Sequence, residues 1–161
     1  MPEHLIRPAQ SAEDIALARC LFEEYQAELG VDLCFQGFAE ELANLPGAYA
    51  PPKGFILLAG IAEQPLGCVA LRPLDAASAR ATCAEMKRLY VRASARGTGL
   101  GRALALAVLD GARRLGYAEV KLDTLAQMQS ARALYRNLGF RECEPYYHNP
   151  LGGTMYMGVS L

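Results

Sequence analysis

The sequence predicts a single α+β domain in which about seven strands and about four helices follow the order β-α-α-β-β-β-α-β-α-β-β. Two kinds of apolar pattern support this prediction. Some short segments alternate or run continuously, as strands do, and longer segments repeat at helical spacing. Capping residues, glycines and prolines separate these segments. No linker divides the 161 residues, so we expect one domain over 1–161.

The first elements are a short strand and two helices. Residues 4–7 are a strand candidate that a proline ends. Ser11 and Asp14, three residues apart, form a capping box, and the apolar spacing after it predicts a helix. That helix ends toward Gly30, because glycine adopts the left-handed conformation of a helix end. A second, shorter helix is predicted over 37–45.

Three strands follow in the middle of the chain. The near-continuous apolar run over 54–61 is typical of a strand that is buried on both faces. A turn leads to a strand over 66–71, so these two segments form a hairpin. After a polar, alanine-rich loop at 75–80, residues 82–91 form the third strand.

The last elements alternate between helix and strand. Helical spacing after a glycine-rich turn predicts a helix that stops at Gly116, with arginines in its last turn. Residues 119–124 form a strand, and Ser130 begins another helix. Two strands, over 140–143 and 154–159, complete the chain.

The glycine-rich turn is the most informative stretch. It reads Arg96-Gly97-Thr98-Gly99-Leu100-Gly101, and Arg102 follows it. Backbone N–H groups converge at the positive end of such a helix, which holds phosphate groups, and glycine lets the backbone approach an anion closely. Arginine at a helix N-terminus opposes the helix dipole, so an anionic ligand explains Arg96 better than solvation does, and for Arg102 phosphate contact and solvation both stay open. The turn predicts a pyrophosphate site.

Two motifs resemble the GCN5-related N-acetyltransferases, the GNAT superfamily. The turn matches the family signature R/Q-x-x-G-x-G/A, and Arg88-Leu89-Tyr90-Val91 matches the run that leads into it. Ala133-Leu134-Tyr135-Arg136-Asn137-Leu138-Gly139-Phe140 resembles the second hallmark, a helix followed by Leu-Gly-Phe. Both motifs are in register with the predicted elements, so the resemblance extends over nearly the whole chain.

The resemblance implies a three-layer α/β/α fold with a mixed, mostly antiparallel central sheet, as in other acyl-CoA N-acyltransferases. It also implies an enzyme that transfers an acetyl group from acetyl-CoA directly to an amine, on a small molecule or a peptide, in a ternary complex. In this family the two central strands separate near the first hallmark. The pantetheine arm of the cofactor pairs with backbone in that opening, like an added strand.

The resemblance also assigns cofactor contacts by position in the motifs. The backbone of Leu89, Tyr90 and Val91 would contact the pantetheine and the thioester. The pyrophosphate contacts would come from Arg96, Gly97, Thr98, Gly99, Leu100, Gly101 and Arg102. Many members have an asparagine near the start of the late helix, where this chain has Met128. Gln129 or Ser130 would replace that contact.

Acetyl transfer to an amine needs a neutral amine, a donor for the developing oxyanion and a proton for the leaving thiolate. Tyr135 lies where many members place the tyrosine that faces the CoA sulfur, and we expect it to supply the proton. The alternative is that Tyr135 is a core residue, because it lies on an apolar helix face. A backbone N–H near Leu89 or Tyr90 is the expected oxyanion donor.

Glu85 is the candidate base, acting directly or through a water. Strand alternation places it on the same face as Lys87, Leu89 and Val91. A partly buried carboxylate there is suited to accept a proton near neutrality. The alternative is that Glu85 simply pairs with Lys87.

The acceptor site has weaker signals. Tyr146 and His148 lie between the last two strands and are expected to border it, although a solvated loop is the alternative. Tyr25 and the region 35–38 are expected to line the acceptor pocket from the early helices.

Composition limits the partners and the compartment. The net charge is −1 and no basic tail is present, so we expect no nucleic acid. The longest apolar run, 55–62, is too short to cross a bilayer, and the N-terminus is unlike a signal peptide, so we expect a cytoplasmic protein that does not bind membranes. The cysteine and histidine spacing predicts neither a disulfide framework nor a metal. A monomer or a homodimer fits the sequence.

Two other functions have partial support in the sequence. Gly97, Gly99 and Gly101 suggest a dinucleotide fingerprint, but that motif requires glycine where Arg102 stands. A catalytically inactive acyl-CoA-binding or regulatory module on the same fold would bind CoA and acetylate no amine. Direct transfer requires no covalent intermediate, and a reactive thiol at Cys83 stays open.

Overall fold

The structure, a computed structural model, describes residues 5–30, 33, 37–61, 63–74, 82–150 and 152–161. Its strands are β1 (Ile6–Pro8), β2 (Phe55–Ile61), β3 (Gln64–Pro73), β4 (Cys83–Val91), β5 (Glu119–Leu125), β6 (Arg141–Glu142) and β7 (Thr154–Ser160). Its helices are α1 (Ala12–Leu29), α2 (Phe38–Ala43), α3 (Leu100–Arg114) and α4 (Gln129–Asn137), with short 3₁₀ turns η2 (Gly47–Tyr49) and η3 (Ala93–Ala95).

The strands form one seven-stranded sheet in the order β1-β2-β3-β4-β5-β7-β6. In the described part of the chain, β4 and β5 are parallel and every other neighbouring pair is antiparallel. The predicted mixed, mostly antiparallel sheet and the predicted element order are therefore confirmed.

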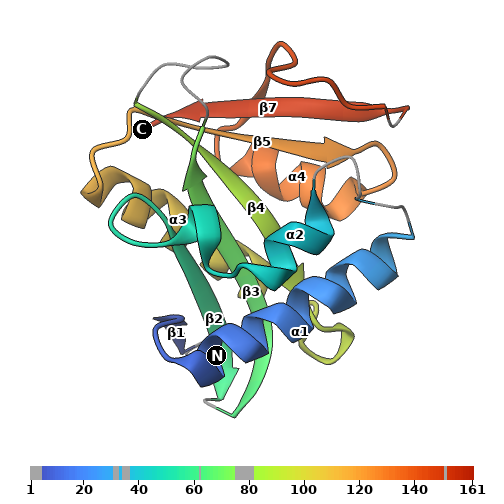
Figure 1. Ribbon diagram of the computed structural model, residues 1–161. Helices are drawn as coiled ribbons and strands as arrows, with labels where there is room; N and C mark the ends of the chain where they lie inside the picture. Colours follow the sequence, from blue (N-terminus) through green and yellow to red (C-terminus); the bar gives the residue numbers. More distant parts are fainter. Residues whose placement is uncertain (1–4, 31–32, 34–36, 62, 75–81, 151) are drawn as a thin grey trace.

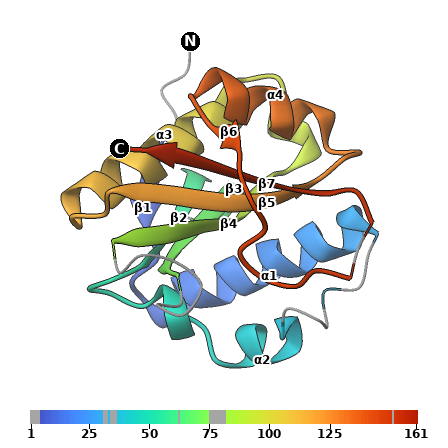
Figure 2. The ribbon, with the colours of Figure 1, turned by 90° about the horizontal axis from the view of Figure 1, so that it is seen from above.

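Helices cover both faces of this sheet. Figure 2 shows α3 and α4 on one face and α1 and α2 on the other. Val69 and Leu71 of β3 belong to the core under α3, whereas Cys68 and Ala70 belong to the core under α1. Successive residues of β3 thus serve opposite cores, as the two-residue period of a strand requires. The three-layer α/β/α fold is confirmed.

The predicted ends of α1 are also confirmed. The Oγ of Ser11 accepts a bond from the Asp14 N–H at 3.1 Å, and the Asp14 carboxylate accepts bonds from the N–H groups of Gln10 and Ser11 at 3.0 and 3.3 Å. The Gln10 N–H and the Arg7 guanidinium, which lies 2.7 Å from Asp14, lower the pKa of that carboxyl to about 2. Gly30 ends the helix at a φ of 72°.

Some boundaries differ from the prediction for physical reasons. Pro8 lies inside β1 because this is an edge strand, where a missing N–H is tolerated. β3 is longer than 66–71, since Gln64 already pairs with Ile61 across the turn. Tyr49 is the last residue of η2 and is buried. The loop at 75–80 lies outside the described residues.

A bulge in β4 corrects one prediction. Arg88 has a φ of 61°, and among the described residues it is the one non-glycine residue with positive φ. The pairing of β4 with β3 shifts by one residue there. Glu85 and Lys87 consequently face α1 and α2, whereas Leu89 and Val91 pack into the core under α3. The prediction that all four share one face is wrong, because the extra residue reverses the alternation.

The two parallel strands separate soon after they meet. β4 pairs with β5 at Cys83↔Glu119, Ala84↔Val120 and Glu85↔Lys121, and the strands then diverge (Figure 1). β4 continues to pair with β3 as far as Val91. From Met86 onward, the edge of β4 that faces β5 has no strand partner within the described residues. This opening organises the candidate site.

Candidate active site

A groove of about 550 Å³ runs from the glycine-rich turn toward the opening between β4 and β5. We call it the long groove. Six of the predicted cofactor residues line it, namely Leu89, Tyr90, Val91, Arg96, Gly101 and Ser130. They come from β4, the glycine-rich turn and the first turn of α4, so the fold brings together residues that lie far apart in the sequence.

The glycine-rich turn has the backbone that the sequence predicts. Gly97 and Gly99 adopt φ angles of 78° and 86°, which favour glycine, and Gly99 is the N-cap of α3. A Cβ at Gly101 would meet only Val91 and Leu134 within 4 Å, at 3.8 and 3.9 Å. The first N–H groups of a helix have no acceptor inside the helix. Gly101, in the first turn of α3, lines the long groove.

The polar side chains of the turn differ in their surroundings. Arg96 forms an ion pair with Glu28 of α1, and its Nε donates to the Val91 carbonyl at 3.0 Å. Thr98 donates its hydroxyl to the Ala95 carbonyl at 2.6 Å. Arg102 is exposed on the first turn of α3. The turn is thus tied to α1 through Arg96, which also lines the long groove.

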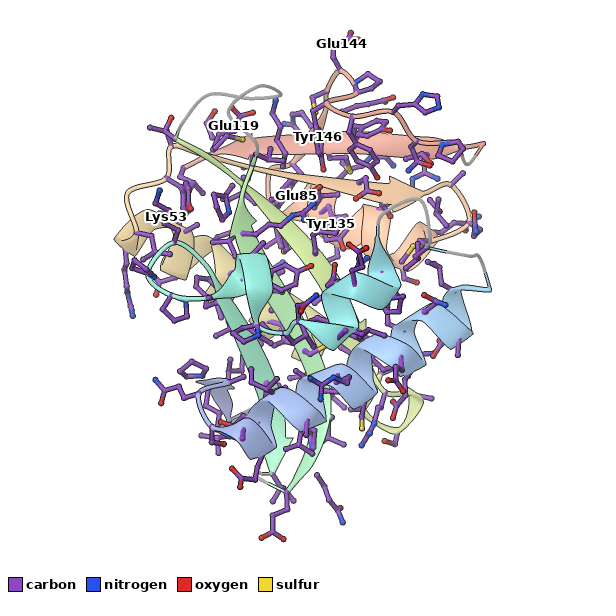
Figure 3. The ribbon with its side chains drawn as sticks, in the orientation of Figure 1. Lys53, Glu85, Glu119, Tyr135, Glu144 and Tyr146 are labelled. Atoms are coloured by element: carbon purple, nitrogen blue, oxygen red, sulfur yellow. The ribbon has the colours of Figure 1, made fainter. Side chains whose placement is uncertain are left out.

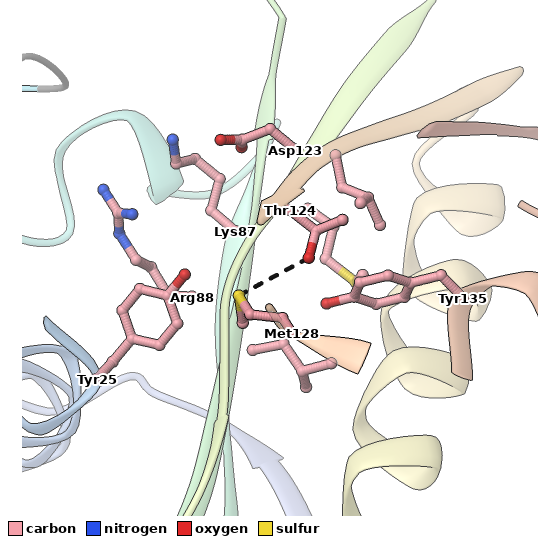
Figure 4. A pocket seen from close by; sticks show the side chains of 10 residues that line it. Tyr25, Lys87, Arg88, Asp123, Thr124, Met128 and Tyr135 are labelled. Atoms are coloured by element: carbon pink, nitrogen blue, oxygen red, sulfur yellow. Dashed lines mark hydrogen bonds between the residues drawn. The ribbon is translucent and has the colours of Figure 1, made fainter. Parts of the chain in front are cut away.

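A pocket of about 30 Å³, the inner pocket, lies between β4 and β5 (Figure 4). Tyr135 reaches it from α4 and directs its hydroxyl toward it. The Tyr135 ring packs against Phe140 with 5.7 Å between ring centroids, and burial raises the pKa of Tyr135. The ring therefore belongs to the core, as the alternative interpretation expected, while the hydroxyl remains protonated at neutral pH and faces the pocket.

Met128 lies at the junction of the long groove and the inner pocket. It lines both spaces and is the N-cap residue of α4. Its sulfur accepts a bond from the Thr124 hydroxyl at 3.8 Å, drawn in Figure 4. Gln129 and Ser130 are exposed beside it and line the long groove.

On the side of α1 and α2, Glu85 is held in a buried network. It is 1% exposed, and its oxygens accept bonds from the Nε of Arg72 at 2.9 Å and the hydroxyl of Tyr146 at 2.6 Å. Burial and the negative charge of Glu85 raise the pKa of Tyr146. Figure 3 shows Glu85 in the middle of the view and Tyr146 above it, beside β7.

Arg88, the residue at the bulge of β4, is also held in place by contacts on the side of α1 and α2. The Arg88 guanidinium donates to both oxygens of Glu41, at 2.9 and 3.0 Å, and lies 5.0 Å from the centre of the Phe38 ring. Burial lowers the pKa of Arg88, but the hydrogen bonds to Glu41, the charge of Glu41 and the neighbouring tyrosines together raise it above its usual range. Phe38 thus lies under the bulge rather than in an open pocket, and Phe35 lies outside the described residues.

Lys87 and Asp123 face one another across the opening, from β4 and β5. Both line the inner pocket, and Lys87 is 6% exposed, so burial lowers the pKa of Lys87. Asp123 accepts a bond from the Tyr147 hydroxyl at 2.6 Å, and that hydroxyl accepts one from the Asn149 amide at 3.0 Å. Asp123 is not among the residues that the sequence predicts for the site. Lys87 and Asp123 are charged residues inside predicted strands, and that pattern is the sequence signal that could have identified them.

A third space, the outer pocket, has a volume of about 480 Å³ and includes Arg72, Glu85, Tyr146 and Tyr147 among its lining residues. Tyr146, which the sequence predicts to border the acceptor, thus lines a pocket. His148 is exposed and lines neither the outer nor the inner pocket. Tyr25 lines both the long groove and the inner pocket.

The structure gives little support to a reactive thiol at Cys83 or to a metal site. Burial raises the pKa of Cys83 to about 11, so its thiol is protonated at neutral pH. The four described cysteines are free, and Cys34 lies outside the described residues. Over the same part of the chain, no three potential metal ligands gather, and no helix has the length and apolar character needed to span a membrane.

Comparison with known proteins gives a consistent result. The sequence profile of the acetyltransferase (GNAT) family matches residues 16–140. The uncharacterized N-acetyltransferase C1271.07c of Schizosaccharomyces pombe is 41% identical over 153 residues, which cover 92% of this chain and 90% of that protein. An acetyltransferase structure from Streptococcus agalactiae is 21% identical, with a TM-score of 0.78 over 100% of both chains. A GNAT-family acetyltransferase structure from Staphylococcus aureus is 19% identical, with a TM-score of 0.77 over 98% of this chain and 99% of that one.

Proposed function

This chain belongs to the acetyltransferase (GNAT) family and is an acyltransferase, and on that premise we propose that it transfers the acetyl group of acetyl-CoA directly to an amine in a ternary complex. The opening between β4 and β5 carries this proposal. It joins the long groove on one side of the sheet to the Lys87 and Asp123 side of the inner pocket. Two substrates that enter from opposite faces would meet there.

The residues of the long groove fit acetyl-CoA. Among the described residues, β4 has no strand partner on this edge at Leu89, Tyr90 and Val91, so its backbone there can pair with an extended pantetheine arm. The turn from Arg96 to Arg102 offers N–H groups at the positive end of α3 to a pyrophosphate. When bound, acetyl-CoA supplies a thioester carbonyl that an amine can attack and a thiolate that leaves.

Residues of the chain would then supply the acid, the oxyanion donor and the base for the transfer. The Tyr135 hydroxyl, protonated at neutral pH, donates a proton on the groove side. A backbone N–H of Leu89 or Tyr90 donates a hydrogen bond to the developing negative charge. On the opposite side, Glu85 receives the proton of the amine through a water, while Arg72 and Tyr146 keep its carboxylate in position.

Calorimetric titration with acetyl-CoA, CoA and NADH tests the cofactor part of this proposal. We expect acetyl-CoA and CoA to bind and NADH not to bind. Gly101→Glu should abolish the binding heat, because it adds a carboxylate where the pyrophosphate is expected. Gly101→Ala is the matched control: its Cβ makes only ordinary contacts, so binding should persist.

Both Gly101 variants should fold. Alanine and glutamate are better helix formers than glycine, by roughly 0.5–1 kcal/mol, and a carboxylate in the first turn favours the helix dipole. Thiol release with a panel of amines then tests transfer. If acetyl-CoA binds and no amine is acetylated, the chain is an acyl-CoA-binding module; if acetyl-CoA does not bind, the proposal is wrong.

A further inference from the structure

Met128 lies between three spaces of the protein and has no part in the proposed reaction. Met128 and Tyr25 are the two described residues that line the long groove, the inner pocket and a further cavity of about 20 Å³, which we call the side cavity. Figure 4 shows the Met128 side chain between Tyr25 and Tyr135. A side chain in this place separates the three spaces, and a shorter one would join them.

The acyl group of the proposed donor, acetyl-CoA, has its place in the inner pocket. Leu89, whose backbone is proposed to contact the thioester, lines both the long groove and the inner pocket. The Tyr135 hydroxyl, which is proposed to protonate the sulfur, faces the inner pocket. A thioester held between these two residues directs its acyl carbons into the inner pocket. The inference therefore rests on the proposed function, since it concerns the acyl donor of the same reaction.

The inner pocket is small. Its volume of about 30 Å³ holds about two water-sized groups, each of which needs roughly 10–15 Å³. The carbonyl oxygen and the methyl group of an acetyl are two such groups. A butyryl group adds two carbons, and the pocket has no volume left for them.

Most walls of the inner pocket cannot move aside for a longer chain. Met86 and Leu122 are 3% and 2% exposed and belong to the core under α3, so a shift of either would disturb close packing. Lys87 and Arg88 form part of the wall on the α1 side, where packing an apolar chain against charged groups carries a desolvation cost. Met128 is half-buried and belongs to neither core, so it is the wall that can be shortened.

Contacts on both the backbone and the side chain hold Met128 in place. Its N–H donates to the Leu125 carbonyl at 3.0 Å, and its carbonyl accepts a bond from the Arg132 N–H at 3.0 Å. Its sulfur accepts the bond from the Thr124 hydroxyl, and Thr124 is buried. The thioether therefore has a defined position at the end of the inner pocket.

We propose that Met128 restricts the acyl donor to short chains, so that the enzyme transfers acetyl efficiently and butyryl poorly. With either donor, the thioester C–S bond breaks and an amide C–N bond forms. The proton of the amine goes to Glu85, and the sulfur takes a proton from Tyr135. The chemistry is the same in both cases, and only the length of the acyl chain distinguishes the donors.

The test compares acetyl-CoA, propionyl-CoA and butyryl-CoA as donors to one amine that is acetylated, with thiol release as the measurement. We expect kcat/KM of the wild type to fall along this series, by roughly 100-fold from acetyl to butyryl, because each methylene that a tight pocket cannot accommodate costs roughly tenfold or more. Equal use of acetyl-CoA and butyryl-CoA would overturn the inference.

Two variants connect this preference to Met128. Met128→Ala removes three heavy atoms, which is more than the two carbons that butyryl adds, and it should join the inner pocket to the side cavity. We expect it to raise the kcat/KM of butyryl-CoA relative to acetyl-CoA at least roughly tenfold. Met128→Leu is the matched control, because leucine has a similar volume, and it should keep the wild-type preference. An unchanged preference in Met128→Ala, or the same loss of preference in both variants, would contradict the proposal.

Calorimetry needs no amine and separates failure of this inference from failure of the proposed function. CoA has no acyl group, so the wild type, Met128→Ala and Met128→Leu should bind it equally, which also shows that the variants are folded. Butyryl-CoA should bind the wild type at least roughly tenfold more weakly than acetyl-CoA, and this difference should disappear in Met128→Ala.

The remaining outcomes of the calorimetry decide against one proposal or both. If Met128→Ala loses CoA binding, or if the wild type binds butyryl-CoA as tightly as acetyl-CoA, Met128 does not set the chain length, and the cofactor site of the wild type stands. If neither CoA nor acetyl-CoA binds the wild type, the proposed function fails, and the inference fails with it.

Discussion

Single residues in this site combine a packing role with a chemical one. Tyr135 packs its ring against Phe140 and presents its hydroxyl to the inner pocket. Glu85 is buried among neighbours that position its carboxylate, and it lies at the edge of the outer pocket. For such residues, a useful substitution removes the chemical group and keeps the shape.

Tyr135→Phe does this for the proposed acid. It keeps the ring and removes the hydroxyl, so we expect kcat to fall about 100-fold, within the range for general acid catalysis. The affinity for acetyl-CoA should change by less than roughly threefold, because the proton is needed only as the thiolate leaves. Thiol release and calorimetry measure the two effects. Equal losses of turnover and binding would assign Tyr135 to cofactor binding instead.

Glu85→Gln tests the proposed base in the same way. The amide can still accept the Tyr146 hydroxyl, but it cannot take up a proton at neutral pH. We expect kcat to fall at least roughly tenfold for an acceptor of ordinary basicity, and less for an acceptor whose amine has a low pKa and is already neutral. Thiol release with two such acceptors measures this. A merely structural role would slow both acceptors equally.

At the scale of elements, local signals predicted most of the chain. The Ser11 capping box, the Gly30 helix end and the glycine-rich turn are all where the sequence places them. The bulge was missed because glycine or asparagine usually marks a positive φ, and an arginine gives no such sign. Its Glu41 and Phe38 partners lie on α2, so the support for that conformation comes from packing that no local pattern shows.

The N-terminal cap of α1 gives a pH-dependent prediction. The folded-state pKa of Asp14 is about 2, below its ordinary 3.8. The ionised carboxylate therefore stabilises the folded protein fully above about pH 4, and this contribution is lost as the pH falls toward 2. Asp14→Asn should cost about 1 kcal/mol of unfolding free energy at pH 7 and about half of that at pH 3. Urea denaturation measures both values. Glu13→Gln, at the exposed neighbour, is the control and should lower the unfolding free energy at pH 7 by less than Asp14→Asn does.

At the scale of the whole molecule, sequence separation limited what could be foreseen. Tyr146 reaches Glu85 across 61 positions, and Tyr147 reaches Asp123 across 24. The predicted element order does not reveal these two hydrogen bonds. They depend on β5 lying beside β4 and on the path of the segment between β6 and β7. The cofactor residues were easier to name, since a contiguous motif with a known geometry contains most of them.

The opening between β4 and β5 also predicts how a ligand affects stability. A ligand that binds only the folded state at 100 times its dissociation constant adds about 2.7 kcal/mol. For a chain of this length, we expect acetyl-CoA to raise the melting temperature by about 5–10 °C. Thermal unfolding with and without acetyl-CoA measures the shift. Gly101→Glu should show none, whereas a similar shift in that variant would place the ligand elsewhere.

The three residue pairs between β4 and β5 have a practical consequence. A break at Gly116 would divide the chain into residues 1–115, which contain β1 to β4 and the glycine-rich turn, and 117–161, which contain β5 to β7 and α4. Each fragment would carry one wall of the long groove. A ligand that touches both walls would then promote reassembly of the two fragments, which is the working principle of a split-protein biosensor for acyl-CoA.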